Sequence, residues 1–260
     1  MSGTETGGEY HDAMVTMLEL VWGEGFMAPG GPELVRETLA GLDLRDKLVV
    51  DIGCGIGGGS LILAGEMGAR VIGLDIEAPL LERAQRYVDK AGLSDRVELM
   101  LTTPGPLPLD DAAVDVVYSS GVFTQVADKL GAFRDIYRVL RPGGLFISYD
   151  WMRGPEPYSD DMRYWFEVEG LTYAMETLEA HGRILEEAGF VDIALSDDGG
   201  WYRRKVHEEH ALMRGPLAAR MRELLGPEQQ AHFVEDWRAM AVVLDKGELR
   251  PGRYRGRKPA

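Results

Sequence analysis

The sequence predicts an α/β protein built on a doubly wound parallel sheet. Short β-branched apolar runs alternate along the chain with longer segments of helical period, which is the pattern of successive βαβ units. The first run, residues 48–52, ends in the glycine-rich turn of residues 53–59, and the second, residues 71–75, ends in an acid. A right-handed crossover between them would bring both strand ends to the same edge of the sheet.

The first 150 residues divide into a helical start and five expected strands. The helical spacing of Met14, Met17, Leu18 and Val21 predicts a first helix, and Pro32 opens a second. The two helices would lie over the ligand crevice as a lid, or only pack on the sheet as a cap. The strands are expected at residues 48–52, 71–75, 97–101, 115–119 and 145–149, with helices from about residue 59, over 80–91 and over 130–140.

After the fifth strand the composition changes, which predicts a helical insertion. Residues 150–178 are rich in aromatics and acids, and a segment that leaves the carboxyl end of a strand would close over the crevice. Further helices are expected over residues 178–189, 201–225 and 233–244, with strands at residues 191–195 and near Tyr254. The sheet would then contain seven strands.

The charge balance argues against several kinds of partner. With 28 Lys and Arg against 43 Asp and Glu, the net charge is −15, so nucleic acid and anionic lipid would be repelled and a small-molecule substrate is expected. There is no apolar run of about 18 residues and no charged-then-apolar leader, which predicts a cytoplasmic protein without a membrane span. The single cysteine, Cys54, predicts no internal disulfide, and the oligomeric state is left open.

The glycine-rich turn and the acid after the second strand predict a nucleoside site. Glycines let a ligand approach the backbone, the next helix offers free N–H groups, and Asp75 is placed to bind two ribose hydroxyls. Asp51 comes just before the turn, where a carboxylate would repel a pyrophosphate but attract the cationic methionine end of S-adenosylmethionine (SAM). We therefore favour SAM over NAD or FAD, although residues 53–58 also fit a dinucleotide motif.

Several motifs together resemble the class I SAM-dependent methyltransferases. They are V-V-D-I-G-C-G-I-G-G-G at residues 49–59, Asp75, D-V-V-Y-S at residues 115–119 and L-R-P-G-G at residues 140–144. A narrower segment, W-G-E-G-F-M-A-P-G-G at residues 22–31, is similar to one in the phosphoethanolamine and the sarcosine and dimethylglycine methyltransferases.

The resemblance implies a Rossmann-like seven-stranded methyltransferase sheet with an N-terminal helical lid and a helical insertion after the fifth strand. It covers nearly the whole chain and implies a single domain of residues 1–260. Lid and cap helices would occupy residues 1–40, the SAM-binding core residues 45–150, and substrate-covering helices with the final strands residues 151–260.

The resemblance also implies roles for individual residues. Tyr10 matches a lid tyrosine that orients the reacting groups, and Gln125 takes the position of a catalytic His, so these two are the candidate catalytic residues. The candidate acceptor-binding residues are Trp151, Trp165 and Glu169, and no metal ligand is expected. The candidate cofactor-binding residues are Met27, Ala28, Asp51, Gly53, Gly55, Asp75, Ile76, Thr103 and Ser119.

Three departures from that group bear on the cofactor and the methyl acceptor. Thr103 replaces an adenine-binding Asp, Gln125 replaces a His and cannot take a proton near neutral pH, and Glu169 replaces a phosphate-binding Arg. Because Glu169 would repel a phosphate, we expect methyl transfer to a small-molecule nucleophile, an amine first, with S-adenosylhomocysteine (SAH) as the product. A phosphoethanolamine-type phosphobase is the alternative, since a small alignment slip would bring Arg163 to the phosphate. A third alternative is a SAM-binding protein that does not methylate any substrate.

Overall fold

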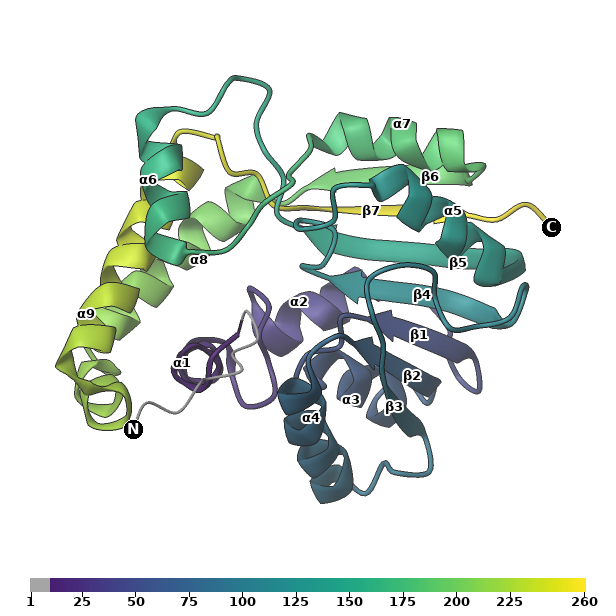
Figure 1. Cartoon of the computed structure of the whole chain (residues 1–260), viewed down its shortest axis with the longest axis horizontal. Helices are drawn as coiled ribbons and strands as arrows, with labels where there is room; N and C mark the ends of the chain where they lie inside the picture. Colours follow the sequence, from purple (N-terminus) through teal and green to yellow (C-terminus); the bar gives the residue numbers. More distant parts are fainter. Residues whose placement is uncertain (1–9) are drawn as a thin grey trace.

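The computed structural model describes residues 10–260, and within them seven strands form one sheet (Figure 1). The order across the sheet is β3-β2-β1-β4-β5-β7-β6, so the strand order reverses between β1 and β4. β1 to β5 run parallel, whereas β7 is antiparallel to both β5 and β6. The predicted α/β sheet is confirmed. Its strands are β1 (Leu48–Ile52), β2 (Arg70–Asp75), β3 (Val97–Leu101), β4 (Val114–Ser120), β5 (Leu140–Asp150), β6 (Val191–Asp197) and β7 (Gly252–Arg257).

Both faces of the sheet are buried, as two neighbouring residues of β1 show. Val49 belongs to a core that includes side chains of α2 (Gly31–Thr38), α3 (Gly58–Gly65) and α4 (Ala78–Ala91). Val50 belongs to a second core with α5 (Lys129–Val139) and α7 (Leu178–Ala188). Successive side chains of a strand point to opposite faces, so a strand covered on both sides must be apolar throughout.

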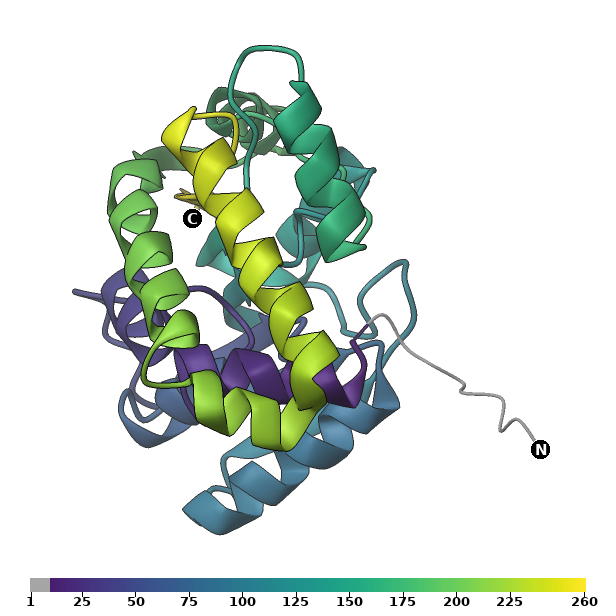
Figure 2. The same cartoon turned by 90° about the vertical axis from the view of Figure 1, so that its left-hand side faces the viewer.

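A layer of helices stands beyond the carboxyl ends of β1 and β4 (Figures 1 and 2). It contains α1 (Asp12–Trp22), α6 (Asp160–Glu169), α8 (Gly199–Arg214) and α9 (Ala218–Asp245). Buried side chains of these helices, including Met17, Trp165, Tyr202 and Trp237, form one apolar cluster. The layer therefore joins the start of the described chain to its last helices, and it closes the side of the molecule toward which the parallel strands point.

Some element boundaries differ from their predicted positions. The segments expected over residues 201–225 and 233–244 form α8 and α9 instead. Pro227 lies inside α9 and is tolerated because Gly226 leaves the helical backbone region, with φ 82° and ψ 165°. β5 starts at Leu140 rather than at residue 145, because Leu140 pairs with Val114 of β4 across a register shift.

No helix within residues 10–260 is long and apolar enough to cross a membrane. In the same part of the chain, no group of three or more His, Cys, Asp or Glu side chains is arranged to hold a metal ion. The first part of the predicted lid, residues 1–9, lies outside the described residues.

Candidate active site

The glycine-rich turn between β1 and α3 forms the floor of the candidate site. Gly53 follows β1 with φ +66°, a left-handed conformation that favours glycine. A Cβ atom at this position would lie 2.0 Å from Val122 Cγ2, so glycine is needed for space as well. α3 begins at Gly58, and its first backbone N–H groups have no partner within the helix. The N–H of Ser60 is bonded to Asp51, which leaves the N–H groups of Gly58 and Gly59 for a ligand that lies on the turn.

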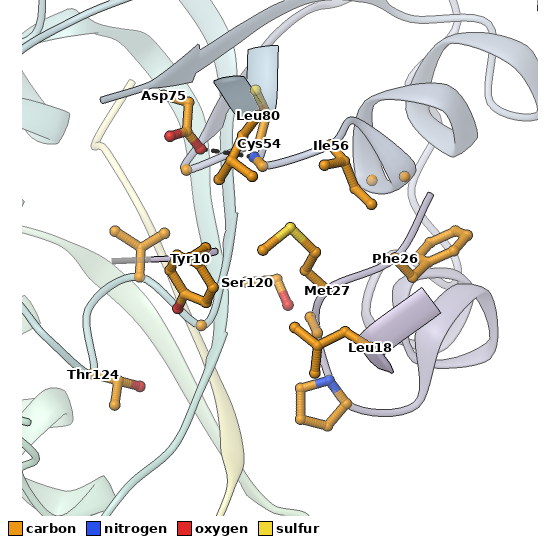
Figure 3. A pocket seen from close by; sticks show the side chains of 18 of the residues that line it. Tyr10, Leu18, Phe26, Met27, Cys54, Ile56, Asp75, Leu80, Ser120 and Thr124 are labelled. Atoms are coloured by element: carbon orange, nitrogen blue, oxygen red, sulfur yellow. Dashed lines mark hydrogen bonds between the residues drawn. The ribbon is translucent and has the colours of Figure 1, made fainter. Parts of the chain in front are cut away.

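Asp75 ends β2 and lies beside this turn (Figure 3). Its Oδ2 accepts a hydrogen bond from the Gly55 N–H (2.8 Å) and its Oδ1 accepts one from the Glu77 N–H (2.9 Å), which fixes the carboxylate. Burial raises the pKa of Asp75, while the backbone hydrogen bonds stabilise its charged form. The remaining lone pairs can accept hydrogen bonds from two hydroxyls, as a ribose would offer.

Asp51 places a second carboxylate at the turn. It is 2% exposed, and its Oδ2 accepts a hydrogen bond from Ser60 Oγ at 2.7 Å. Burial raises the pKa of Asp51 to about 7, although the hydrogen bond from Ser60 favours the charged form. A positive charge bound here would stabilise the ionised carboxylate. This end of the site therefore favours a cationic ligand group over an anionic one.

A cavity of about 260 Å³ extends from the turn into the helical layer. Met27, in the loop after α1, projects into it between Ile56 and Tyr10 (Figure 3). Toward the layer, the lining changes to aromatic and acidic side chains from β5 onward. The cavity therefore has a glycine-rich end at the sheet and an aromatic end among the helices.

Most of the predicted site residues line this one cavity. Tyr10 and Gln125, the candidate catalytic residues, both lie on it. Their chemical roles stay predictions, but segments that are far apart in sequence bring them to one space. The predicted residues that line the cavity are Tyr10, Met27, Ala28, Asp51, Gly53, Gly55, Asp75, Ile76, Gln125, Trp151 and Glu169.

Three predicted residues do not line the cavity. Ser119 points away from it because side chains alternate along β4, and its Oγ donates a hydrogen bond to the Ile52 carbonyl (3.1 Å); the next residue, Ser120, lines the cavity instead. Thr103 is exposed, and its neighbour Thr102 takes the lining position. Trp165 is fully buried in the helical layer, behind the cavity wall.

Substrate-covering helices were predicted within residues 151–260, but no individual site residue was predicted on α9. Asp236, Trp237 and Met240 line the aromatic end of the cavity. Their spacing carried a signal, since Phe233, Trp237 and Met240 recur at i, i+4 and i+7 and predict an apolar helix face. Asp236 lies on that apolar face, where a carboxylate needs a specific partner.

All charged side chains that line the cavity within the described residues are acidic. They are Asp51, Asp75, Glu77, Glu169 and Asp236, with no Lys, Arg or His among the lining residues. Glu169 accepts a hydrogen bond from the Tyr173 hydroxyl. Arg163, the residue that an alignment slip would bring to a phosphate, is exposed and pairs with Asp160 (2.7 Å) outside the cavity lining. The cavity is therefore suited to neutral or cationic groups.

Known proteins are similar to this chain in sequence. Residues 50–148 match a family model described as a methyltransferase domain. Phosphoethanolamine N-methyltransferase 3 of Arabidopsis thaliana is 32% identical over 202 residues, which cover 77% of this chain and 40% of the relative. The wheat (Triticum aestivum) phosphoethanolamine N-methyltransferase is 28% identical over 96% of this chain and 49% of the relative. The chain thus spans less than half the length of these curated relatives.

Solved structures share the fold. Phosphoethanolamine N-methyltransferase 2 of Haemonchus contortus, in complex with phosphomonomethylethanolamine and SAH, superposes with a TM-score of 0.90 at 23% identity, over 97% of this chain and 59% of that chain. A protein described as a sarcosine dimethylglycine methyltransferase from Galdieria sulphuraria gives 0.82 at 20% identity, over 95% and 97%. Residues 50–148 thus match a methyltransferase domain, and by its sheet and these relatives the chain resembles the class I SAM-dependent methyltransferases and, among them, their phosphoethanolamine N-methyltransferase group.

Proposed function

We propose that this chain binds SAM and transfers its methyl group to a small amine that carries no acidic group. The glycine turn would lie under the cofactor, Asp75 would bind the ribose hydroxyls, and Asp51 would face the cationic methionine part. Bound SAM supplies a methyl group on a positively charged sulfur. The side chain of Met27 would cover the cofactor from the side of α1.

Replacing Asp75 with alanine should weaken SAM binding by about 1.5–3 kcal/mol, the range for lost hydrogen bonds to a charged group. The affinity is measured by calorimetric titration of SAM. Because Asp75 also accepts two backbone hydrogen bonds in the turn, the unfolding midpoint of the variant is measured in parallel. Unchanged affinity in a folded variant would remove Asp75 from the cofactor site.

One observation supports the choice of acceptor: the charged lining of the cavity is wholly acidic within residues 10–260. A phosphobase, such as the phosphomonomethylethanolamine bound by the Haemonchus contortus enzyme, would bring a phosphate against Glu169 and Asp236 without a cation to receive it. An amine without a phosphate or carboxylate group meets no such repulsion. Its positive charge would also be stabilised by the faces of Trp151 and Trp237.

With purified protein, ethanolamine should be methylated with a kcat/KM at least about 100-fold above that for phosphoethanolamine, because a reversed charge in a partly desolvated site is worth several kcal/mol. SAH formation is the readout, and 2-phenylethylamine tests whether the apolar walls favour a larger amine. Rapid turnover of phosphoethanolamine that is lost in Arg163→Ala would instead establish the phosphobase alternative. SAM binding without SAH formation from any of these amines would favour a SAM-binding protein that does not methylate.

Four further predictions remain predictions. They are the single-domain organisation, the lid role of α1, the cytoplasmic location and the absence of a nucleic-acid partner. Whether α1 acts as a lid or as a fixed cap, Glu19 of α1 ties that helix to the cofactor half of the molecule. Its carboxylate accepts hydrogen bonds from the Gly25 N–H (2.7 Å), Tyr87 Oη (2.5 Å) and Arg83 (2.5 Å). Tyr87 and Arg83 lie on α4, so α1 is linked to a helix that packs on the sheet, and an opening motion would break these contacts.

A further inference from the structure

Methyl transfer to an amine needs a group that can take a proton. A nitrogen attacks through its lone pair, yet an aliphatic amine is mostly protonated near neutral pH. Gln125 lines the cavity but is an amide, which has no basic site at this pH. Its Nε2 is buried and has no hydrogen-bond partner among the described residues. The site around Gln125 therefore has an unpaired donor but still lacks a proton acceptor.

Asp236 is the carboxylate on the same cavity that is best placed to accept a proton. It is 3% exposed and lies on the cavity wall. Trp165 Nε1 donates a hydrogen bond to its Oδ1 at 3.1 Å. No donor among residues 10–260 is bonded to its Oδ2, which leaves that oxygen for a ligand. Trp165 was predicted to bind the methyl acceptor, but it lies outside the cavity lining and instead holds the carboxylate of Asp236 in place.

We propose that Asp236 binds the amino group of the methyl acceptor through Oδ2 and takes the proton that the nitrogen must lose, an inference that rests on the proposed methylation of amines. The proton moves from the ammonium nitrogen to the carboxylate. The lone pair that this frees forms the bond to the methyl carbon, and the electron pair of the broken carbon–sulfur bond stays on sulfur. Asp236 afterwards returns its proton to solvent.

The surroundings of Asp236 favour both the binding of an ammonium group and the removal of its proton. Burial raises its pKa to about 7, and the negative charge of Glu235 adds to the increase, whereas the indole N–H of Trp165 lowers it. A carboxylate with such a pKa is a far better proton acceptor near neutral pH than an exposed one. The aromatic rings of Trp151, Tyr173 and Trp237 line the same end of the cavity and would stabilise the bound ammonium.

The other charged groups around Asp236 are already paired. Glu169 of α6 accepts a hydrogen bond from the Tyr173 hydroxyl. Glu209 of α8 accepts hydrogen bonds from two indole N–H groups and a phenol hydroxyl. Glu235 pairs with Arg238 (2.6 Å) and is bonded by the exposed Tyr164 hydroxyl (2.8 Å). Asp236 thus combines near-complete burial, a place on the cavity wall and an oxygen, Oδ2, to which no donor among the described residues is bonded.

The first test compares Asp236→Asn with Glu235→Gln, its neighbour on the same helix. Asparagine keeps the size and still offers an oxygen to Trp165. With ethanolamine at pH 7.5, we expect kcat/KM to fall about 100-fold in Asp236→Asn, a typical loss for a missing general base, and to change less than about threefold in Glu235→Gln. SAM affinity should be the same in both variants and the wild type.

The pH profile separates proton transfer from packing. In the wild type, kcat/KM should fall tenfold per pH unit below about 7, because a protonated Asp236 cannot take a proton. In Asp236→Asn, kcat/KM should rise tenfold per unit up to the pKa of the amine, since only free amine then reacts. Trp165→Phe, which keeps Asp236 but removes its donor, should move the acidic limb to higher pH.

A binding measurement does not depend on turnover. Calorimetric titration of 2-phenylethylamine into the SAH complex should show at least tenfold weaker binding in Asp236→Asn than in Glu235→Gln. Equal amine binding and the same pH profile in wild type and Asp236→Asn would overturn the role of Asp236 and leave the methyltransferase proposal standing. If the wild type binds SAM but neither binds nor methylates amines, the proposed function fails and this inference with it.

Discussion

Replacing Glu209 with alanine is expected to lower the free energy of unfolding by about 3–5 kcal/mol, because three buried donors would each lose their acceptor at a cost of about 1–3 kcal/mol. Glu209 of α8 is 2% exposed. Its Oε1 accepts a hydrogen bond from Trp22 Nε1, and its Oε2 accepts bonds from Trp237 Nε1 and the Tyr202 hydroxyl, each at 3.0 Å. Alanine would leave three buried donors without an acceptor and open a cavity among them.

Glu208→Ala is the matched control, since Glu208 precedes Glu209 on the same helix and is 67% exposed in its side chain, and its one ion pair within the described part of the chain is with Lys205 at 4.0 Å. It should cost less than about 0.5 kcal/mol. Urea unfolding of both variants measures the difference. The loss of stability in Glu209→Gln should lie between those of the two alanine variants, because the glutamine NH₂ group would be a donor that faces other donors. Equal stabilities for the Glu208 and Glu209 variants would show that the network contributes little.

This network also connects stability to the proposed site. Trp22 comes from α1 and Trp237 from α9, and both line the cavity. Glu209 does not line the cavity, and its bonds to both indole N–H groups fix the orientation of the two rings. A Glu209 variant that still folds should therefore also bind amines more weakly, because the rings that stabilise the ammonium lose their fixed orientation.

The sheet could be predicted from sequence because its signals are local. Residues 97–101 form β3 with the expected bounds. The turn after β1 needs glycines, and these can be identified directly in the sequence. The start of β5 could not be predicted, because it depends on the pairing of Leu140 with Val114 of another strand. Local patterns determine elements, whereas their ends are determined by partners that are distant in sequence.

The aromatic end of the site was harder to predict for the same reason. The sequence near Trp165 places large apolar residues on several faces of α6, but of this helix only Glu169 lines the cavity, because Trp165 packs in the cluster with α9. For the pair Ser119 and Ser120, the alternation of a strand indicates that one faces the ligand, but the helical layer decides which. Asp236 was missed because its importance comes from burial beside Trp165, 71 residues away in sequence.

Replacing Gly53 with alanine should destabilise the fold by about 2–5 kcal/mol and weaken SAM binding as well. Left-handed backbone costs an ordinary residue about 1–2 kcal/mol, and the new methyl would displace Val122, which adds about 1–3 kcal/mol. Val122 belongs to the loop after β4 and lines the cavity, so its displacement also disturbs the surface that meets the cofactor. Urea unfolding and calorimetric titration of SAM measure the two effects.

Gly121→Ala separates the two causes, because Gly121 also has a left-handed φ, +85°, but within residues 10–260 no atom beyond its own two chain neighbours lies within 4 Å of the position of its Cβ. It should show the backbone cost alone, about 1–2 kcal/mol. In Gly53→Ala/Val122→Ala, the atom that clashes is gone, so the double variant should recover most of the difference between the two single glycine variants. Equal stabilities of Gly53→Ala and Gly121→Ala would show that Val122 moves aside at no cost. The turn would then need glycine at residue 53 for its backbone conformation and not for the close approach of the loop after β4.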